Sequence, residues 1–147
     1  MSLSKELQTG KAGEHLVCCD LIIQGFNAFL ADQGLPFDVL VEKNGILKRI
    51  QVKTTTKLID SSKSKRIYRF GTRRAKGGIS RVREAEVDYF AFVALDIKQI
   101  AYIPIKEMLV HSGKVKQTMD FKSRQIKYTT RSYSGGKYFE DFSKFEI

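Results

Sequence analysis

Residues 36–55 read PFDVLVEKNGILKRIQVKTT and carry the strongest indication of how the chain folds. Its Asn44-Gly45 dipeptide lies between two apolar-rich runs. Asn-Gly is the preferred pair for a two-residue type I′ turn, because both central residues of that turn need a positive φ. The sequence therefore predicts a β-hairpin whose strands cover residues 37–42 and 46–55.

The turn also sets which residues of the hairpin face each other. Counting outward from Asn44 and Gly45 pairs Asp38 with Gln51, and Lys53 returns to the same face two positions later. The apolar positions form the opposite face: Val39, Val41, Ile50 and Val52. The hairpin is thus expected to have a core side and a side on which three polar groups converge.

Elements around the hairpin indicate an α/β domain. Ser4 is placed to cap a helix that runs to Gln24, with Gly25 just past its end. Residues 88–95 form a near-continuous apolar run, which is typical of a strand buried on both faces. Further strands are expected over 26–30, 66–70 and 99–103, with one or two more within 121–147, and a helix over 105–110 after Pro104.

Length and composition favour a single domain, 1–147, in the ordinary globular range. No stretch approaches the ~20 apolar residues of a membrane span. The N-terminal residues lack a secretory signal, so a cytoplasmic location is expected. Cys18 and Cys19 are adjacent and unaccompanied by other cysteines, so they are interpreted as small core residues rather than a disulfide framework or zinc site.

The net charge of +10 is unevenly distributed. Residues 57–83 hold ten Lys or Arg against one acid, and residues 114–137 hold seven against one, so the remainder is net negative. Clustered cations repel each other unless a polyanion neutralises them. An anionic membrane or an acidic protein would be alternatives, but no amphipathic helix or lipidation signal accompanies the basic runs. Nucleic acid is therefore the predicted partner.

A basic DNA-recognition insertion is expected over residues 57–87. Arginine can fork onto a guanine edge, whereas lysine more often neutralises phosphates, and the sequence does not separate the two roles. Tyr68 and Phe70 alternate with the cations and are predicted to pack against the sheet rather than stack on bases. The predicted DNA-binding residues are Lys57, Lys63, Lys65, Arg66, Arg69, Arg73, Arg74, Lys76, Arg81 and Arg83.

The polar face of the hairpin has the composition of a metal-assisted hydrolytic site. Asp38 and Gln51 supply oxygen atoms, which hard divalent cations prefer, and Lys53 can orient water or stabilise developing negative charge. A further carboxylate is wanted, and Glu14 is a candidate that periodicity does not place. The alternative is an exposed cross-strand ion pair between Asp38 and Lys53, with Gln51 as a neutral neighbour.

Five segments together resemble the PD-(D/E)XK nuclease core: Gly13-Glu14, Pro36-Phe37-Asp38, Gln51-Val52-Lys53, 88–92 and 101–105. The resemblance implies a restriction-endonuclease-like α+β fold, with a central mixed sheet flanked by helices. It also implies that Glu14, Asp38, Gln51 and Lys53 are catalytic and that the first three bind Mg²⁺, for which Mn²⁺ can substitute. Two positions depart from the pattern, because Phe37 separates the proline from the aspartate and Gln51 replaces the usual second acid.

Within this superfamily the chain most resembles the bacterial group I intron-encoded homing endonuclease of PD-(D/E)XK type. That resemblance implies site-specific double-strand DNA cleavage by a homo-oligomer of even copy number, a dimer or a tetramer, with neither a membrane nor a small-molecule substrate. One catalytic site per chain agrees, since two strands must be cut. The alternatives are a Holliday-junction resolvase of the same superfamily and a non-catalytic DNA-binding module.

Overall fold

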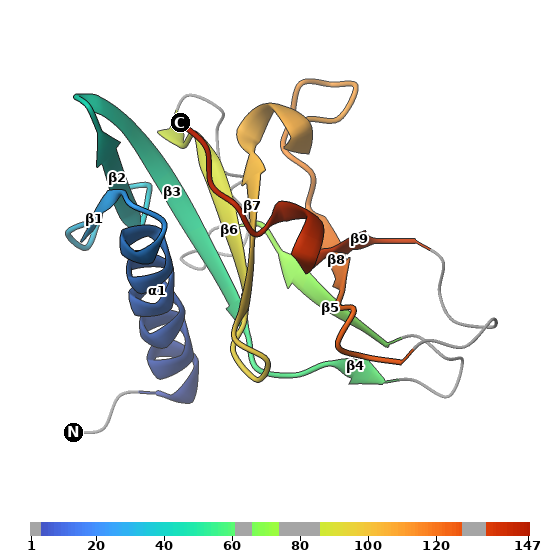
Figure 1. Cartoon of the computed structure of the whole chain (residues 1–147). Coiled ribbons are helices and arrows are strands. Elements are labelled where there is room, and N and C mark those ends of the chain that lie inside the picture. The colour runs from blue at the N-terminus through green and yellow to red at the C-terminus, as the bar shows by residue number, and fades with distance from the viewer. Residues whose placement is uncertain (1–3, 61–65, 74–85, 128–134) are drawn as a thin grey trace.

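The computed structural model describes residues 4–60, 66–73, 86–127 and 135–147, which form two sheets and one long helix (Figure 1). The five-stranded sheet has the order β1-β2-β3-β6-β7. Its strands are β1 (Asn27–Leu30), β2 (Val39–Lys43), β3 (Ile46–Thr55), β6 (Tyr89–Ala94) and β7 (Gln99–Pro104). The second sheet, β4-β5-β8-β9, contains β4 (Ile59–Asp60), β5 (Arg66–Gly71), β8 (Thr118–Lys122) and β9 (Lys137–Tyr138).

Helix α1 (Lys5–Ile23) begins and ends where the sequence predicts. The Ser4 hydroxyl accepts a 3.3 Å hydrogen bond from the Leu7 N–H, and Gly25 follows the helix with a φ of +98°. The buried face comprises Gly13, Val17 and Leu21, which recur every four residues. The interpretation of both cysteines as core residues was wrong for Cys19, which is exposed, while Cys18 lies half-buried at the edge of the core. Position 19 is two residues from the buried stripe and so points away from it.

The predicted hairpin is confirmed. Strands β2 and β3 are antiparallel with Val39 opposite Ile50, and Asn44 and Gly45 have positive φ values of 52° and 82°. Strand β3 then pairs in parallel with β6, so the sheet is mixed. The fold class expected from the sequence is therefore correct.

Two cores lie on the two faces of the central sheet. Beneath α1, Val17 and Leu21 pack on the apolar face predicted for the hairpin. On the other face, Phe92 of β6 packs against Phe70 of β5, with ring centroids 5.1 Å apart. In the described residues this second face is covered by the smaller sheet and by two 3-10 helices, η2 (Ile105–Met108) and η3 (Phe139–Phe142), rather than by α-helices. Aromatic side chains of β5, β8 and η3 supply that layer: Tyr68, Phe70, Phe121 and Phe139.

The helix expected over 105–110 is only the short η2, which follows Pro104 as predicted. It ends because Leu109 is extended, with φ −81° and ψ 137°, and bridges to Val115. Strand β4 was not predicted. Of the late strands expected within 121–147, β9 lies inside that range, whereas β8 begins before it, at Thr118. Phe139 and Phe145 of the tail are buried. No helix in the described ranges is long and apolar enough to cross a membrane.

The predicted insertion, residues 57–87, contributes β4 and β5 to the second sheet. Strand β5 pairs with β8, which comes some fifty residues later in the chain. The described part of this segment therefore belongs to the layer that covers the second face of the central sheet.

Candidate active site

Asp38 lies immediately before β2, at the open end of the hairpin. Its backbone N–H donates to the Ile50 carbonyl at 2.9 Å, and its carboxylate atom Oδ2 accepts hydrogen bonds from Gln51 Nε2 at 2.7 Å and from the Val52 N–H at 2.8 Å. Because β2 begins only at Val39, the Val52 N–H has passed the end of its partner strand, and the carboxylate satisfies it. The predicted contact between Asp38 and Gln51 is confirmed.

Lys53 follows two residues after Gln51, so both side chains leave β3 on the same face. The Lys53 ammonium donates a 2.7 Å hydrogen bond to the backbone carbonyl of Arg73, the residue two positions after the end of β5. The Lys53 charge also lowers the pKa of Asp38, which places the two groups within electrostatic reach. Strand β3 thus presents an amide and an ammonium on the side where Asp38 lies.

Helix α1 brings Glu14 to the same region, which periodicity alone did not place. Gly13 packs so closely on β3 that an added Cβ would lie 1.9 Å from Thr54 Oγ1. Glu14 therefore lies beside the end of β3, half-buried. Burial raises the pKa of Glu14, and the nearby Asp38 carboxylate raises it further.

Asp38 itself is held in an environment that opposes its charge. Burial raises the pKa of Asp38 above its ordinary value, although the Val52 hydrogen bond and the Lys53 and Lys11 charges act in the opposite direction. Its hydrogen-bond donors, Gln51 and Val52, are both neutral. Two neighbouring carboxyls with raised pKa values form a site that a cation would stabilise.

The family model described as PD-(D/E)XK endonuclease matches residues 4–138. The chain belongs to the PD-(D/E)XK endonuclease family. The match covers α1, the hairpin and the later strands, and it confirms the resemblance seen in the sequence. Among curated proteins, none matches this sequence.

Two solved structures are similar to this PD-(D/E)XK chain to different degrees. The bacterial homing endonuclease I-Ssp6803I aligns with a TM-score of 0.66 at 15% identity, over 90% of this chain and 84% of that one. Hjc, a Holliday junction resolvase from the archaeal hyperthermophile Archaeoglobus fulgidus, aligns with a TM-score of 0.46 at 18% identity, over 76% and 83%. The first of these likenesses agrees with the restriction-endonuclease-like architecture described above.

The oxygen donors of this PD-(D/E)XK chain fit a hard divalent cation. Within the described residues no group of three or more His, Cys, Asp or Glu side chains is arranged to hold a metal, so the available set is two carboxylates and one amide. The amide nitrogen of Gln51 donates its hydrogen bond to Asp38, so the amide oxygen is the atom that would bind a metal. Glu14, Asp38 and Gln51 would thus supply two negative charges and a neutral oxygen, a suitable shell for Mg²⁺ completed by water.

Lys11 is a functional candidate that the sequence reading missed. It lies one helical turn before Glu14, and its charge lowers the pKa values of both Glu14 and Asp38. The i, i+3 spacing of Lys11 and Glu14 was the available signal, because such pairs share a helix face. An exposed cation beside two carboxyls is well placed to contact a phosphate.

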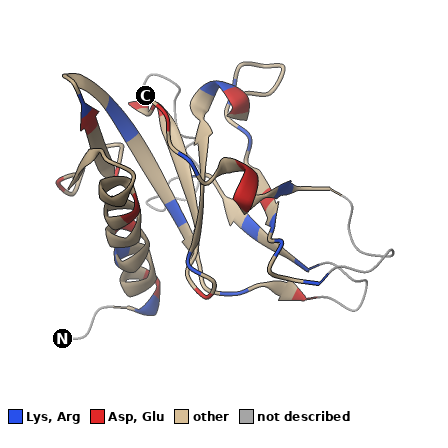
Figure 2. Cartoon of the chain, viewed as in Figure 1, with Lys and Arg blue, Asp and Glu red and all other residues tan. Residues whose placement is uncertain are grey.

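The predicted DNA-binding residues have different surroundings in the PD-(D/E)XK chain. Lys57 is exposed beyond β3. Arg66 lies near Asp60, 3.5 Å away, and Arg69 makes a two-pronged ion pair with Asp120, with N–O distances of 2.8 and 3.1 Å. Figure 2 shows Lys and Arg on β5 and β9, with acidic residues in η3. Arg73 is exposed just after β5. The remaining six lie outside the described residues: Lys63, Lys65, Arg74, Lys76, Arg81 and Arg83.

Tyr68 and Phe70, which alternate with these cations, are buried in the core, so the prediction that they pack against the sheet is confirmed. The Tyr68 hydroxyl donates a 2.7 Å hydrogen bond to Asp96. Neither ring is therefore presented for stacking on a base. The outward positions of β5 belong to Arg66, Arg69 and Gly71.

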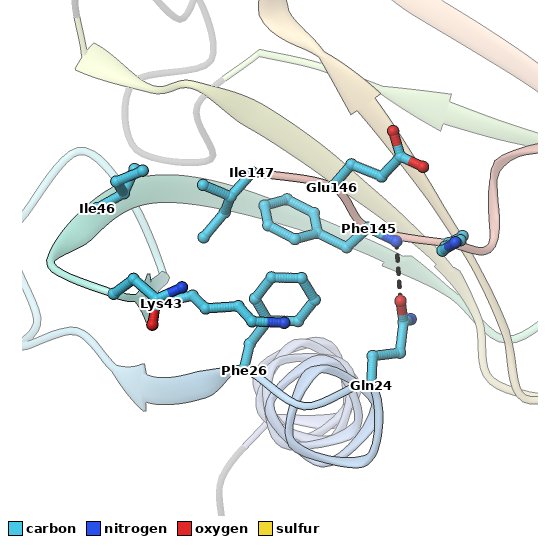
Figure 3. Close-up of a pocket in the computed structure, with 9 residues that line it drawn as sticks. Gln24, Phe26, Lys43, Ile46, Phe145, Glu146 and Ile147 are labelled. Atoms are coloured by element: carbon cyan, nitrogen blue, oxygen red, sulfur yellow. Dashed lines mark hydrogen bonds between the residues drawn. The ribbon is translucent and has the colours of Figure 1, made fainter.

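A separate pocket of about 400 Å³ lies between the hairpin turn and the C-terminal residues (Figure 3). Phe26 and Phe145 line it, and the Lys43 ammonium lies 4.8 Å from the Phe26 ring centre. The Phe145 N–H donates to Gln24 Oε1 at 2.9 Å, which ties the tail to the end of α1. None of the four predicted catalytic residues lines this pocket.

Proposed function

We propose that this chain is a site-specific double-strand DNA endonuclease of the homing type, which hydrolyses phosphodiesters with Mg²⁺, for which Mn²⁺ can substitute. One observation carries the proposal: the Asp38 carboxylate is bound by Gln51 and Val52, while Glu14 and Lys53 lie within electrostatic reach of it. Two acids, an amide and an ammonium therefore lie in one region, at the open end of the hairpin. Such a site can offer oxygen ligands to a metal ion and a positive charge to a phosphate, which suits phosphodiester hydrolysis.

The alternative of a simple surface ion pair explains less. In such a pair Asp38 would be stabilised by Lys53 and its pKa would lie below the ordinary value. Instead burial dominates and the pKa of Asp38 is raised, while the Lys53 ammonium donates to the Arg73 carbonyl. An under-compensated carboxylate beside a second acid is better explained by a cation site.

Glu14, Asp38 and Gln51 would hold the metal, and Lys53 would act on the phosphate. When bound, Mg²⁺ lowers the pKa of a coordinated water and polarises a phosphoryl oxygen. Lys53 would donate hydrogen bonds to the phosphate oxygens as negative charge develops on them. Val52 holds Asp38 in place through its N–H, so the carboxylate is oriented before substrate arrives.

DNA is the proposed substrate because the chain carries a net charge of +10, with nine of these charges over residues 57–83. Cations of that density bind phosphates with strong salt dependence. Because each chain carries one site and a duplex has two strands, we propose a homo-oligomer of even copy number, a dimer or a tetramer. The insertion over residues 57–87 would provide sequence recognition.

The experiment is a cleavage assay on a random-sequence duplex library with Mg²⁺, with Mn²⁺ and with EDTA, followed by sequencing of the ends. We expect metal-dependent double-strand cuts at a recurring sequence. Asp38→Asn and Lys53→Ala should abolish cutting while DNA affinity changes by less than about threefold, because neither residue supplies most of the phosphate contacts. Glu42→Gln, in the same hairpin but bonded to Asn27 and Gly45, is the control and should cut normally.

Three outcomes would overturn the proposal. Retained cutting by either variant would exclude the assigned site. Cutting of a synthetic four-way junction but of no linear duplex would instead indicate recognition of branched shape. Tight DNA binding without cutting in either metal would indicate a non-catalytic binding module.

A further inference from the structure

The proposed catalytic lysine is bonded to the backbone just before the basic segment. Lys53 Nζ donates to the Arg73 carbonyl at 2.7 Å, and Arg73 directly precedes residues 74–83, which hold four Lys or Arg. An ammonium has three donors, so a bond to one fixed carbonyl restricts how the other two can point. The position of the Arg73 carbonyl therefore affects the orientation of the Lys53 ammonium.

Thr72 fixes that position. The residue is only 3% exposed, its N–H donates to the Gln117 carbonyl at 3.0 Å, and its hydroxyl donates to the Lys116 carbonyl. The Lys116 N–H in turn donates at 2.7 Å to the carbonyl of Met108, a fully buried residue. Thr72 is thus tied at two points to a segment that is itself anchored in the core.

These contacts are made by successive residues of the chain. Thr72 anchors the chain where β5 has ended, the next carbonyl is that of Arg73, and that carbonyl receives the lysine. The simplest competing explanation is that the Thr72 hydroxyl only satisfies a buried carbonyl and contributes to stability alone. Under that explanation, loss of the hydroxyl would lower stability without changing the contact between Lys53 and the Arg73 carbonyl. The two explanations therefore predict different effects on Lys53.

We propose that Thr72 is a positioning residue for Lys53, which fixes the Arg73 carbonyl so that the lysine ammonium is oriented toward the scissile phosphate. The proposal rests on the proposed function, because it deepens the assignment of Lys53. The bonds that hold Thr72 run to the carbonyls of Lys116 and Gln117. Thr72 acts through one backbone carbonyl, that of Arg73.

The test compares Thr72→Val, which keeps the shape but removes the hydroxyl, with Thr72→Ser, which keeps the hydroxyl. With a cleavable duplex and saturating Mg²⁺, Thr72→Val should lower kcat about 10- to 100-fold, the usual effect of misplacing a catalytic group. KM and DNA affinity should stay within about twofold of the parent, because phosphate binding is spread over many cations. Thr72→Ser should restore kcat to near the parent's value.

A second measurement does not depend on cleavage. In the full chain without DNA, the lysine side chains labelled with ¹³C at Cε are titrated by NMR, and the Lys53 signal is assigned by its loss in Lys53→Ala. A carbonyl that accepts from the ammonium stabilises the charged form. The Lys53 pKa should therefore fall in Thr72→Val and not in Thr72→Ser.

Ser123→Ala serves as the stability control, because Ser123 is fully buried and its hydroxyl bonds Glu140 and the Gln125 N–H. All assays are run well below the unfolding temperature of each variant. The control should be destabilised without loss of kcat and without a change in the Lys53 titration. If Ser123→Ala loses kcat as Thr72→Val does, general destabilisation explains the effect and the inference is wrong.

Two further results would overturn the inference. If Thr72→Val keeps the parent's kcat and the parent's Lys53 titration, the Thr72 hydroxyl contributes to stability only. If Thr72→Ser is impaired as much as Thr72→Val, the hydroxyl is not the group that positions Lys53. If the parent protein cuts no DNA, the proposed function is wrong instead. In that case an unchanged Lys53 pKa in Thr72→Val would still reject the contact proposed here.

Discussion

Gln51 donates its side-chain amide to the Asp38 carboxylate at 2.7 Å, at the position where the PD-(D/E)XK pattern usually has a second acid. A neutral donor at this point stabilises an ionised Asp38 without adding negative charge beside it. The metal ligands of this chain are thus less repulsive to each other, and less attractive to a dication, than two facing carboxylates would be.

Gln51→Glu should therefore make the protein less stable without metal and more strongly stabilised by Mg²⁺. The change replaces a hydrogen bond by two like charges, which we expect to cost about 1–2 kcal/mol at pH 8 in EDTA. Repulsion between Asp38 and the new carboxyl would raise their pKa values, so one of them would take up a proton as pH falls. The loss of stability should therefore shrink as pH falls toward 5. Thermal unfolding with EDTA and with Mg²⁺ at both pH values measures this.

Gln125→Glu is the matched control, since Gln125 is exposed and lies in the turn after β8. It should stay within about 0.5 kcal/mol of the parent and respond to Mg²⁺ as the parent does. Equal unfolding temperatures of parent and Gln51→Glu in EDTA at pH 8 would contradict the predicted repulsion.

Glu14→Gln should stabilise the metal-free protein at neutral pH. Burial and the neighbouring Asp38 raise the pKa of Glu14, and an acid whose pKa is higher in the folded state loses stability as pH rises through that range. Removing the charge should add about 0.5 kcal/mol after solvent screening, or about 1–2 °C. The gain should vanish below the carboxyl pKa range, and Mg²⁺ should stabilise the variant less than the parent.

The control for Glu14→Gln is Glu6→Gln, in the first turn of the same helix. Glu6 is favourably placed at a helix N-terminus, so losing its charge should not stabilise the protein. A Glu14→Gln variant that unfolds at a lower temperature than the parent in EDTA would show that Glu14 makes a stabilising contact instead.

Local signals predicted the hairpin and α1 because their determinants are adjacent in the chain. Asn44-Gly45 sets the turn and hence the contact of Asp38 with Gln51, and Ser4 and Gly25 set the helix ends. The hydrogen bond from the Val52 N–H to Asp38 was not predictable in the same way, because it depends on β2 starting two residues later than expected.

Contacts between distant segments were not predictable from these signals. The proximity of Glu14 to Asp38 depends on how closely Gly13 approaches Thr54, and no periodicity encodes that distance. The second sheet pairs β5 with β8, and its two-residue strands carry almost no pattern. Thr72 was overlooked for this reason, because its partners lie more than forty residues away.

Asp88→Asn should destabilise the fold where β3 enters its parallel pairing with β6. The Asp88 carboxylate accepts from the Arg49 N–H at 2.8 Å and pairs with its guanidinium at 3.1 Å. Burial opposes ionisation, but these bonds outweigh it and the pKa of Asp88 is lowered. Because both side chains are partly exposed, we expect a cost of about 1 kcal/mol at pH 7.

The sign of the pH dependence is opposite to that for Glu14. A group with a lowered pKa contributes stability above its unfolded pKa and loses that stability as pH falls through its folded pKa. The stability difference between parent and Asp88→Asn should therefore shrink as pH falls below the ordinary aspartate value of 3.8. Denaturant unfolding from pH 3 to 7 measures this. Asp141→Asn is the control, because its pair with Arg124 is half-exposed and should matter less. A pH-independent difference between parent and Asp88→Asn would exclude the charge as its cause.

Asp120→Asn should tighten DNA binding, because Asp120 neutralises Arg69 across the β5–β8 pair. The Arg69 side chain is 46% exposed, while two hydrogen bonds hold its guanidinium on Asp120. Without the acid, Arg69 would interact more strongly with phosphates, and the dependence of log Kd on log salt should steepen by about one unit. Fluorescence anisotropy over a KCl series measures this slope.

Glu42→Gln, the control, removes the same charge at the hairpin and should leave the slope unchanged. Equal steepening in both variants would mean that only net charge matters, and an unchanged slope in Asp120→Asn would place Arg69 away from the DNA.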